Sequence, residues 1–162
     1  MTMIAGFHGA ARALLTFGIL LNTCAVLSSG AAQAQVVDRP SSVIKSWSDA
    51  YAKRSGDAIS RLYSRDAVHW GLLGKEPNIG VEAIKQHYDR TAKDVIERSV
   101  SITKMNMSSR KRITQVVGTM ETKSKLSDGT MRSNTARFTM SIIRESRRQW
   151  SIISHHVSVM PN

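Results

Sequence analysis

Cysteine and acidic residues are both scarce in this sequence of 162 residues. The single cysteine, Cys24, excludes an intramolecular disulfide and a zinc site built from several thiolates. Only 12 Asp and Glu accompany 23 Lys and Arg, so the net charge is +11. Internal repeats are absent, as are bilayer-spanning apolar runs beyond the amino-terminal region. At 41% hydrophobic and 22% charged residues, the composition indicates one globular domain held together by packing.

The motifs of common catalytic machineries are missing as well. The sequence contains no nucleophile elbow, no glycine-rich phosphate loop and no dinucleotide fingerprint. Its histidines lack a carboxylate placed to complete a metal site, which needs three or four converging ligands. The sequence therefore predicts no cofactor and no metal.

The first 34 residues have the pattern of a secretory signal peptide. Arg12 precedes an apolar run over residues 13–27, and small residues end in Ala32-Gln33-Ala34. We predict cleavage after Ala34 and a periplasmic or secreted location. The alternatives are a buried amphipathic helix, although the run is apolar on all sides, and a lipid anchor at Cys24, although the residues before it are not small. Cleavage leaves residues 35–162, with no cysteine and a net charge of +10.

Helical spacing dominates the first half of residues 35–162. Apolar side chains recur every three or four residues over 43–51 and again over 81–95. We expect the first helix to begin after a cap at Ser41 or Ser42 and to end near Gly56. Asp57 is expected to cap a short second helix. Residues 67–70 indicate a strand and residues 71–80 a loop.

From residue 99 the spacing changes to alternation. Strands are predicted over residues 99–107, 113–126, 130–143 and 149–159, with turns at 110–112, 127–129 and 144–148. Ser127-Asp128-Gly129 is the strongest hairpin signal, and Gly118 predicts a bulge. Helices followed by antiparallel strands give the α+β class.

Four segments in this order carry a resemblance to a known superfamily. They are residues 47–51 (WSDAY), 62–68 (LYSRDAV), 80–84 (GVEAI) and 150–161 (WSIISHHVSVMP). Together they resemble the nuclear transport factor 2-like superfamily, and within it the SnoaL-like and SgcJ/EcaC-type domains and the calcium/calmodulin-dependent kinase II association domain. The resemblance implies a cone-shaped fold in which N-terminal helices pack on a bent antiparallel sheet around a pocket. It does not fix a function, because this fold hosts isomerases, dehydratases, cyclases and non-enzymes.

Alternation predicts which strand residues face the helices. In the third long strand these are Ala136, Phe138, Met140 and Ile142, and in the last strand Ile153, His155, Val157 and Val159. His156 is expected on the outer face. A one-residue bulge would exchange the two faces.

His87 and His155 are the candidate catalytic residues, since two imidazoles could shuttle a proton near neutral pH. His87 also falls where the resembling kinase domain has a pocket histidine, but Val157 and Met140 stand where that domain has arginines. A pocket would be lined by Trp47, Tyr51, Tyr63, Trp70, Phe138, Met140 and Val157. Each of these residues can instead be an ordinary core residue. The absence of Asp and Glu from the inner strand faces counts against typical isomerase chemistry.

These observations predict an exported small-molecule-binding domain of the SnoaL-like type, for a small apolar or carbonyl ligand, with or without weak isomerase-, dehydratase- or cyclase-like activity. The alternative is a non-catalytic association module whose cavity is plugged by Trp47, Phe138 and Met140. We expect a homodimer through the outer sheet face, where Arg137, Thr139, Trp150 and Ile152 should lie. Export excludes a nucleic-acid partner. The basic turns form either a solvated rim or a surface weakly attracted to an anionic envelope.

Overall fold

The computed structural model describes residues 39–160. The elements are α1 (Pro40–Ala52), α2 (Gly56–Ser60), β1 (Tyr63–Trp70), β2 (Asn78–Ile79), α3 (Val81–Ala92), β3 (Val95–Arg110), β4 (Ile113–Leu126), β5 (Met131–Ser146) and β6 (Gln149–Val159). None of the helices in this part of the chain has the length and hydropathy to cross a membrane. The predicted signal peptide, residues 1–34, lies outside the described residues.

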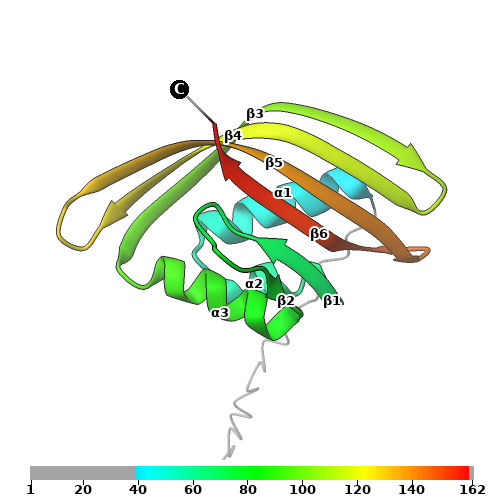
Figure 1. Ribbon diagram of the computed structural model, residues 1–162, viewed down its shortest axis with the longest axis horizontal. Coiled ribbons are helices and arrows are strands. Elements are labelled where there is room, and N and C mark those ends of the chain that lie inside the picture. The colour runs from blue at the N-terminus through cyan, green and yellow to red at the C-terminus, as the bar shows by residue number, and fades with distance from the viewer. Residues whose placement is uncertain (1–38, 161–162) are drawn as a thin grey trace, which may run out of the picture. The chain divides into compact units, whose positions relative to one another are not determined.

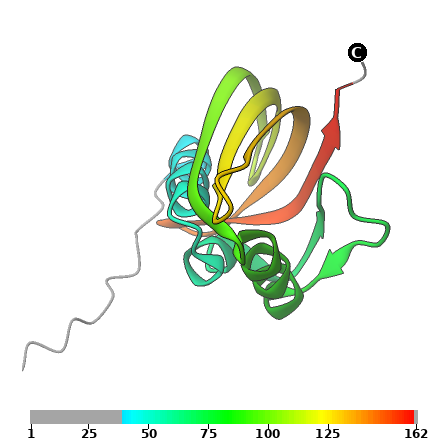
Figure 2. The same ribbon diagram turned by 90° about the vertical axis from the view of Figure 1, so that its left-hand side faces the viewer.

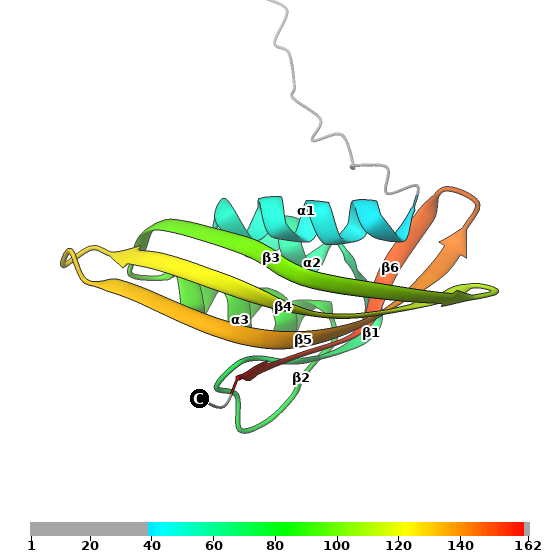
Figure 3. The same ribbon diagram turned by 90° about the horizontal axis from the view of Figure 1, so that it is seen from above.

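The six strands form one mixed sheet in the order β2-β1-β6-β5-β4-β3. Neighbours from β3 to β6 are antiparallel, as expected, but β1 pairs with β6 in parallel, which the prediction of an antiparallel sheet missed. The sheet curls, and the three helices lie on its concave side (Figures 1 and 2). Seen from above, β3, β4 and β5 run beside one another along α1 (Figure 3). The predicted α+β class is confirmed.

The helix ends differ from the prediction. Arg39, not Ser41 or Ser42, occupies the N-cap position of α1, and Pro40 follows it at the first helical position. Proline suits this position because the N–H it lacks would have no partner there. Gly56 does not end α1 but opens α2, and the cap of α2 is Ser55, whose hydroxyl accepts a hydrogen bond from the Ala58 amide at 3.1 Å. The sequence offers several polar residues at the start of α1 and of α2, and the cap of each of these helices lies two residues before the predicted position or earlier.

The strand predictions hold well in the second half of the chain. The bounds of β4 and β6 are those predicted, whereas β3 extends further at both ends, and β5 begins at Met131 and extends further at its carboxyl end. The hairpin at 127–129 is present: the Gly129 amide donates to the Leu126 carbonyl at 3.0 Å, and Gly129 has a φ of 86°. Only glycine adopts this φ readily, which explains why the glycine at position 129 indicated a hairpin turn.

The bulge expected at Gly118 lies instead on the neighbouring strand. Thr103 of β3 is the extra residue, between pairs formed by Ile102 and Lys104. A Cβ at Gly118 would lie 2.3 Å from the Lys104 carbonyl oxygen and 2.8 Å from the Phe138 ring. Glycine is required there because the bulged partner strand and an aromatic ring both approach it closely.

A second bulge changes the inner face of β6. Ile153 is the extra residue between the pairs Ser141–Ser154 and Ile142–Ile152. His155 and Val157 face inward as predicted, but Ile152 is also fully buried, while Val159 is half exposed. The expectation of Ile152 on the outer face is therefore wrong, as is that of Trp150, which is partly buried against the core.

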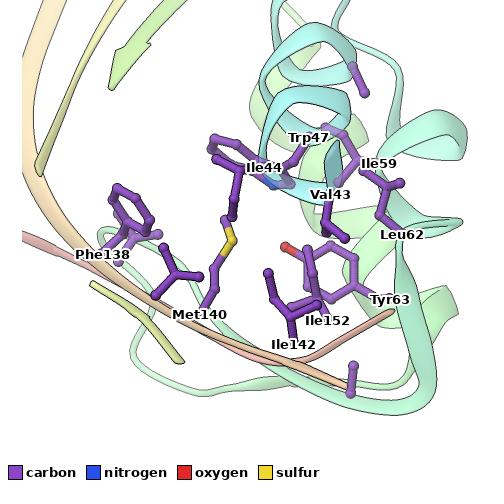
Figure 4. Packing of buried hydrophobic residues seen from close by; sticks show 14 of the residues in the cluster. Val43, Ile44, Trp47, Ile59, Leu62, Tyr63, Phe138, Met140, Ile142 and Ile152 are labelled. Carbon is purple, nitrogen blue, oxygen red and sulfur yellow. The ribbon is translucent and has the colours of Figure 1, made fainter. Parts of the chain in front are cut away.

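The core lies between α1 and the concave face of the sheet. Ile44 and Trp47 of α1 reach toward Phe138 and Met140 of β5, with Tyr63 beside them (Figure 4). The predicted inner face of β5 is confirmed, since its four apolar residues are all at most 3% exposed. This packing leaves α3 and the loop after β1 to close the other end of the concave face.

Candidate functional site

A cavity of about 370 Å³ lies between the concave face of the sheet, α1, α3 and the loop after β1. Its walls are mainly apolar and aromatic, with Tyr88 and two histidines, His69 and His87, on the helical side. The volume is at the lower end of the range of about 300–1,000 Å³ typical of small-molecule sites.

The residues predicted to line a pocket fall into three groups. Trp47, Tyr51, His87 and Val157 line the cavity. Tyr63, Phe138, Met140 and His155 are buried in the core and are not part of the lining. Trp70 projects from the opposite face of β1, where its indole N–H donates to the Gly74 carbonyl at 2.7 Å.

A chain of buried hydrogen bonds lies behind the cavity wall. The Tyr88 hydroxyl lies 3.2 Å from His69 Nε2 and 3.3 Å from the Tyr63 hydroxyl, and it accepts from the Trp47 indole N–H at 3.2 Å. The Tyr63 hydroxyl lies 2.7 Å from His155 Nδ1. Four elements, α1, β1, α3 and β6, are thus joined through side chains that would be costly to bury unpaired.

Asn78 fixes the direction of this chain. Its Nδ2 donates to the His69 carbonyl at 3.3 Å, so the same nitrogen must also donate to His69 Nδ1 at 3.4 Å. His69 therefore carries its proton on Nε2 and donates it to Tyr88. Because Tyr88 then accepts from both His69 and Trp47, it donates to Tyr63, which donates to His155 Nδ1. His155 Nε2 holds the remaining N–H and is buried without a partner.

Sequence reasoning did not single out His69 and Tyr88 as site residues. His69 is two positions after the buried Ala67 on β1, and Tyr88 is four positions after the buried Ile84 on α3. Both spacings place the side chains on inward faces. The alternation within residues 67–70 was therefore a usable signal for His69, although four residues are a short run on which to fix a face.

The histidines in and behind the cavity wall are neutral near pH 7. Burial, and secondarily the nearby His87 and His156, lowers the pKa of His69 to about 3. Burial likewise lowers the pKa of His155 well below its ordinary value, with smaller contributions from the other histidines. The pKa of His87 is lowered by burial and then by the charges of Arg90 and Arg98. These imidazoles offer hydrogen-bond donors and acceptors rather than charge.

The arrangement is chemically suited to recognition. No Asp or Glu belongs to the cavity lining, and no three His, Asp or Glu side chains among residues 39–160 converge to hold a metal. Within the same residues the imidazole of His87 forms no hydrogen bond, so its nitrogens are available to a molecule in the cavity.

The fold and the cavity together define the class of the protein. A curled sheet with helices on its concave side is the nuclear transport factor 2-like architecture, and residues 41–162 match the SnoaL-like domain family. The chain therefore belongs to the SnoaL-like family. No protein of curated function matches it.

Solved structures agree on the fold. The chain is 20% identical to a candidate calcium/calmodulin-dependent protein kinase II association domain from Xanthomonas campestris, with a TM-score of 0.68 and coverage of 75% of this chain and 86% of that one. A candidate dehydratase of the nuclear transport factor 2-like family from Streptomyces avermitilis gives 14% identity, a TM-score of 0.65 and coverage of 74% and 93%. A ketosteroid isomerase-like protein from Erwinia carotovora atroseptica SCRI1043 gives 13% identity, a TM-score of 0.64 and coverage of 78% of this chain and 95% of that one. At these identities the similarity establishes the fold alone.

Proposed function

We propose that this protein binds a small, largely apolar molecule in the cavity between the sheet and α3. The cavity itself carries the proposal: about 370 Å³ of space with aromatic walls and the unpartnered imidazole of His87 at its surface. A ligand carbonyl or hydroxyl could pair with that imidazole while the walls cover its apolar part.

The alternative of an association module with a filled cavity is less well supported. Phe138 and Met140, which were expected to plug the space, pack instead against α1. Trp47 forms part of the wall, stacked on Tyr51 with ring centroids 5.2 Å apart. The space between sheet and helices is thus left open by the side chains that could have closed it.

Binding is also better supported than a proton shuttle between His87 and His155. A shuttle needs an imidazole that gains a proton near neutral pH, but burial lowers the pKa of both residues. The ring of His69 contacts both, with centroids 4.8 Å from His87 and 5.1 Å from His155. If turnover of a substrate is found, survival of that turnover in both His87→Ala and His155→Ala would exclude the shuttle.

The binding proposal can be tested with a matched pair of variants on one strand. Thr122 of β4 lines the cavity, whereas Thr119 projects from the other face of the sheet. We expect small aromatic carbonyl compounds that raise the melting temperature of the protein to lose this effect in Thr122→Phe and to keep it in Thr119→Phe. Equal shifts in both variants would place binding outside the cavity.

We further propose that the protein is exported and cleaved after Ala34. The charged, apolar and small-residue segments of residues 12–34 support this. Expression in a bacterial host should give a periplasmic or secreted product whose amino terminus is Gln35. Replacing both Ala32 and Ala34 by Arg should leave the precursor uncleaved, because the peptidase site accepts small residues. A cytoplasmic, full-length product from the unaltered gene would contradict the proposal.

A further inference from the structure

One row of residues across the sheet carries an arginine at each end. Arg98 on β3 pairs with Ser124 on β4, and Ser124 pairs with Arg132 on β5. Directly paired residues project to the same face of a sheet, and all three line the cavity. Neighbouring strands are about 4.8 Å apart, so the two arginine Cα atoms are about 10 Å apart. Both side chains are long enough to meet over the Ser124 hydroxyl.

The positive charge of this row is only weakly offset within residues 39–160, by Asp128, whose carboxylate interacts with Arg132 from outside the cavity lining. Neither guanidinium forms an ion pair there, and no carboxylate lines the cavity. Arg112 differs from both arginines, because its Nε and one terminal nitrogen together donate to the carbonyls of Arg144 and Glu145. The arginine row therefore keeps donors available for a negatively charged group.

Arg98 is held in position while part of its donor capacity stays unused. Its guanidinium carbon lies 4.6 Å from the centre of the Tyr51 ring, and one terminal nitrogen donates to the Thr91 carbonyl. Its Nε is buried and has no partner. A buried N–H of a charged group without an acceptor is unfavourable, so Arg98 retains donor capacity that no group among residues 39–160 uses.

On one side of the arginine row the cavity-facing rows become progressively less polar, and on its other side the apolar pair Val95 and Leu126 also lines the cavity. The row next to the arginines contains Thr122 and Asn134, and the row after that contains Met120 and Ala136. Trp47 closes the apolar side. The concave face thus presents a cationic row beside an apolar region formed by Met120, Ala136 and Trp47.

We propose that the ligand of this cavity is a small amphipathic carboxylate, with its apolar part against Met120, Ala136 and Trp47 and its carboxylate over Ser124 between Arg98 and Arg132. Arginine suits this role because its planar fork of donors matches the two oxygens of a carboxylate. This proposal rests on the proposed function and names its ligand class.

The test compares acids with their neutral carboxamides. Benzoate, 2-naphthoate and 4-phenylbutyrate, each beside its carboxamide, would be titrated into the protein at low salt with calorimetric detection. We expect at least one acid to bind about tenfold more tightly than its amide, as charge-assisted hydrogen bonds imply. The preference should shrink as salt screens the arginines.

Two variants on β5 supply the matched control. Arg132→Gln removes a guanidinium from the cavity side, whereas Arg137→Gln removes one that projects from the outer face and donates to Ser158. Loss of the acid preference in Arg132→Gln and its retention in Arg137→Gln would support the proposal. Arg132 is exposed, so its replacement should not affect folding, and Arg98→Gln adds a second measurement where the melting temperature is retained.

The outcomes separate this inference from the function on which it rests. Equal binding of acids and amides, abolished by Thr122→Phe, would overturn the carboxylate proposal and leave small-molecule binding intact. A preference for acids that survives Arg132→Gln would also overturn it. Absence of binding by every acid would overturn it as well.

Discussion

At the scale of single residues, the hydroxyl of Tyr88 is the point on which the buried polar side chains depend. It accepts from Trp47 and His69 and donates to Tyr63. Burial raises its pKa well above the ordinary value, so the hydroxyl is protonated near neutral pH. A single oxygen therefore joins α1, β1 and α3 at the cavity wall.

Tyr88→Phe should destabilise the protein. The change leaves two buried N–H groups without an acceptor, which typically costs about 1–3 kcal/mol each when nothing replaces it. We expect a lower midpoint of urea denaturation with an unchanged slope. Tyr51→Phe is the control, because the Tyr51 hydroxyl makes no hydrogen bond within residues 39–160 while its ring lines the same cavity. Equal stabilities of the two variants would mean that the hydrogen-bonded chain contributes nothing.

The buried histidines make stability depend on pH. Because the pKa of His69 falls from 6.5 to about 3 on folding, the unfolded chain binds a proton between these values that the folded protein does not. The contribution of the neutral histidine to the free energy of unfolding is therefore complete above pH 6.5. It decreases on acidification, by at most about 1.4 kcal/mol per pH unit for each such histidine. Lowered pKa values of His155 and His87 act in the same direction.

Urea denaturation at pH 7.5, 6 and 5 would measure this dependence. His69→Gln should reduce the slope of stability against pH more than His156→Gln does, because His156 is exposed and only secondarily lowers the pKa of His69. A stability that stays constant from pH 7.5 to pH 5 would contradict the neutral state of the buried imidazoles.

At the scale of secondary-structure elements, the bulge in β3 and the glycine opposite it act together. Gly118→Ala places a methyl group 2.3 Å from the Lys104 carbonyl and against the Phe138 ring. Backbone must move to admit it, so we expect a loss of about 1–3 kcal/mol in denaturation experiments. Gly74→Ala, whose nearest neighbours lie at 3.4 Å, should be tolerated. An unaffected Gly118→Ala protein would show that the bulge can relax.

Strands were predictable from the sequence to the extent that pairing follows local alternation. The inner face of β5 could be predicted from the two-residue periodicity alone. The turn at Gly129 could be predicted from the φ that glycine prefers. The bulges at Thr103 and Ile153 depend on how two distant strands meet, and no local pattern contains that information. One of them moved Ile152 from the outer face to the core.

The candidate site was predictable to a similar degree. Trp47, Tyr51, His87 and Val157 reached the cavity because helix and strand periodicity set their faces. The arginine row was not foreseen, because only the register of three strands brings Arg98 and Arg132 into line with Ser124.

At the scale of the whole molecule, the outer face of the sheet is the surface on which we expect two copies to associate. A row of Asn106, Val117, Thr139, His156 and Trp70 crosses five strands there. Val117 and Trp70 are 43% and 40% exposed, so apolar area lies open in the single chain. Exposed apolar surface of this kind commonly marks a contact between proteins.

Val117→Lys should therefore halve the mass measured by analytical ultracentrifugation, because burying a lysine ammonium in the contact is unfavourable. Met131→Lys is the control, since Met131 is 64% exposed but lies at the hairpin end of β5. A monomeric unaltered protein would contradict the expectation, as would equal masses of unaltered protein and Val117→Lys.

The strand order also affects how the chain is made. β6 is synthesised after the other five strands of the sheet, yet it sits inside the sheet between β1 and β5. Until residues 149–159 leave the ribosome, β1 and β5 each have an edge with unpaired backbone N–H and C=O groups. The partner of β1 on that edge lies more than eighty residues further along the chain. A stop codon placed at position 150 would thus remove an interior strand, and the truncated product should be insoluble.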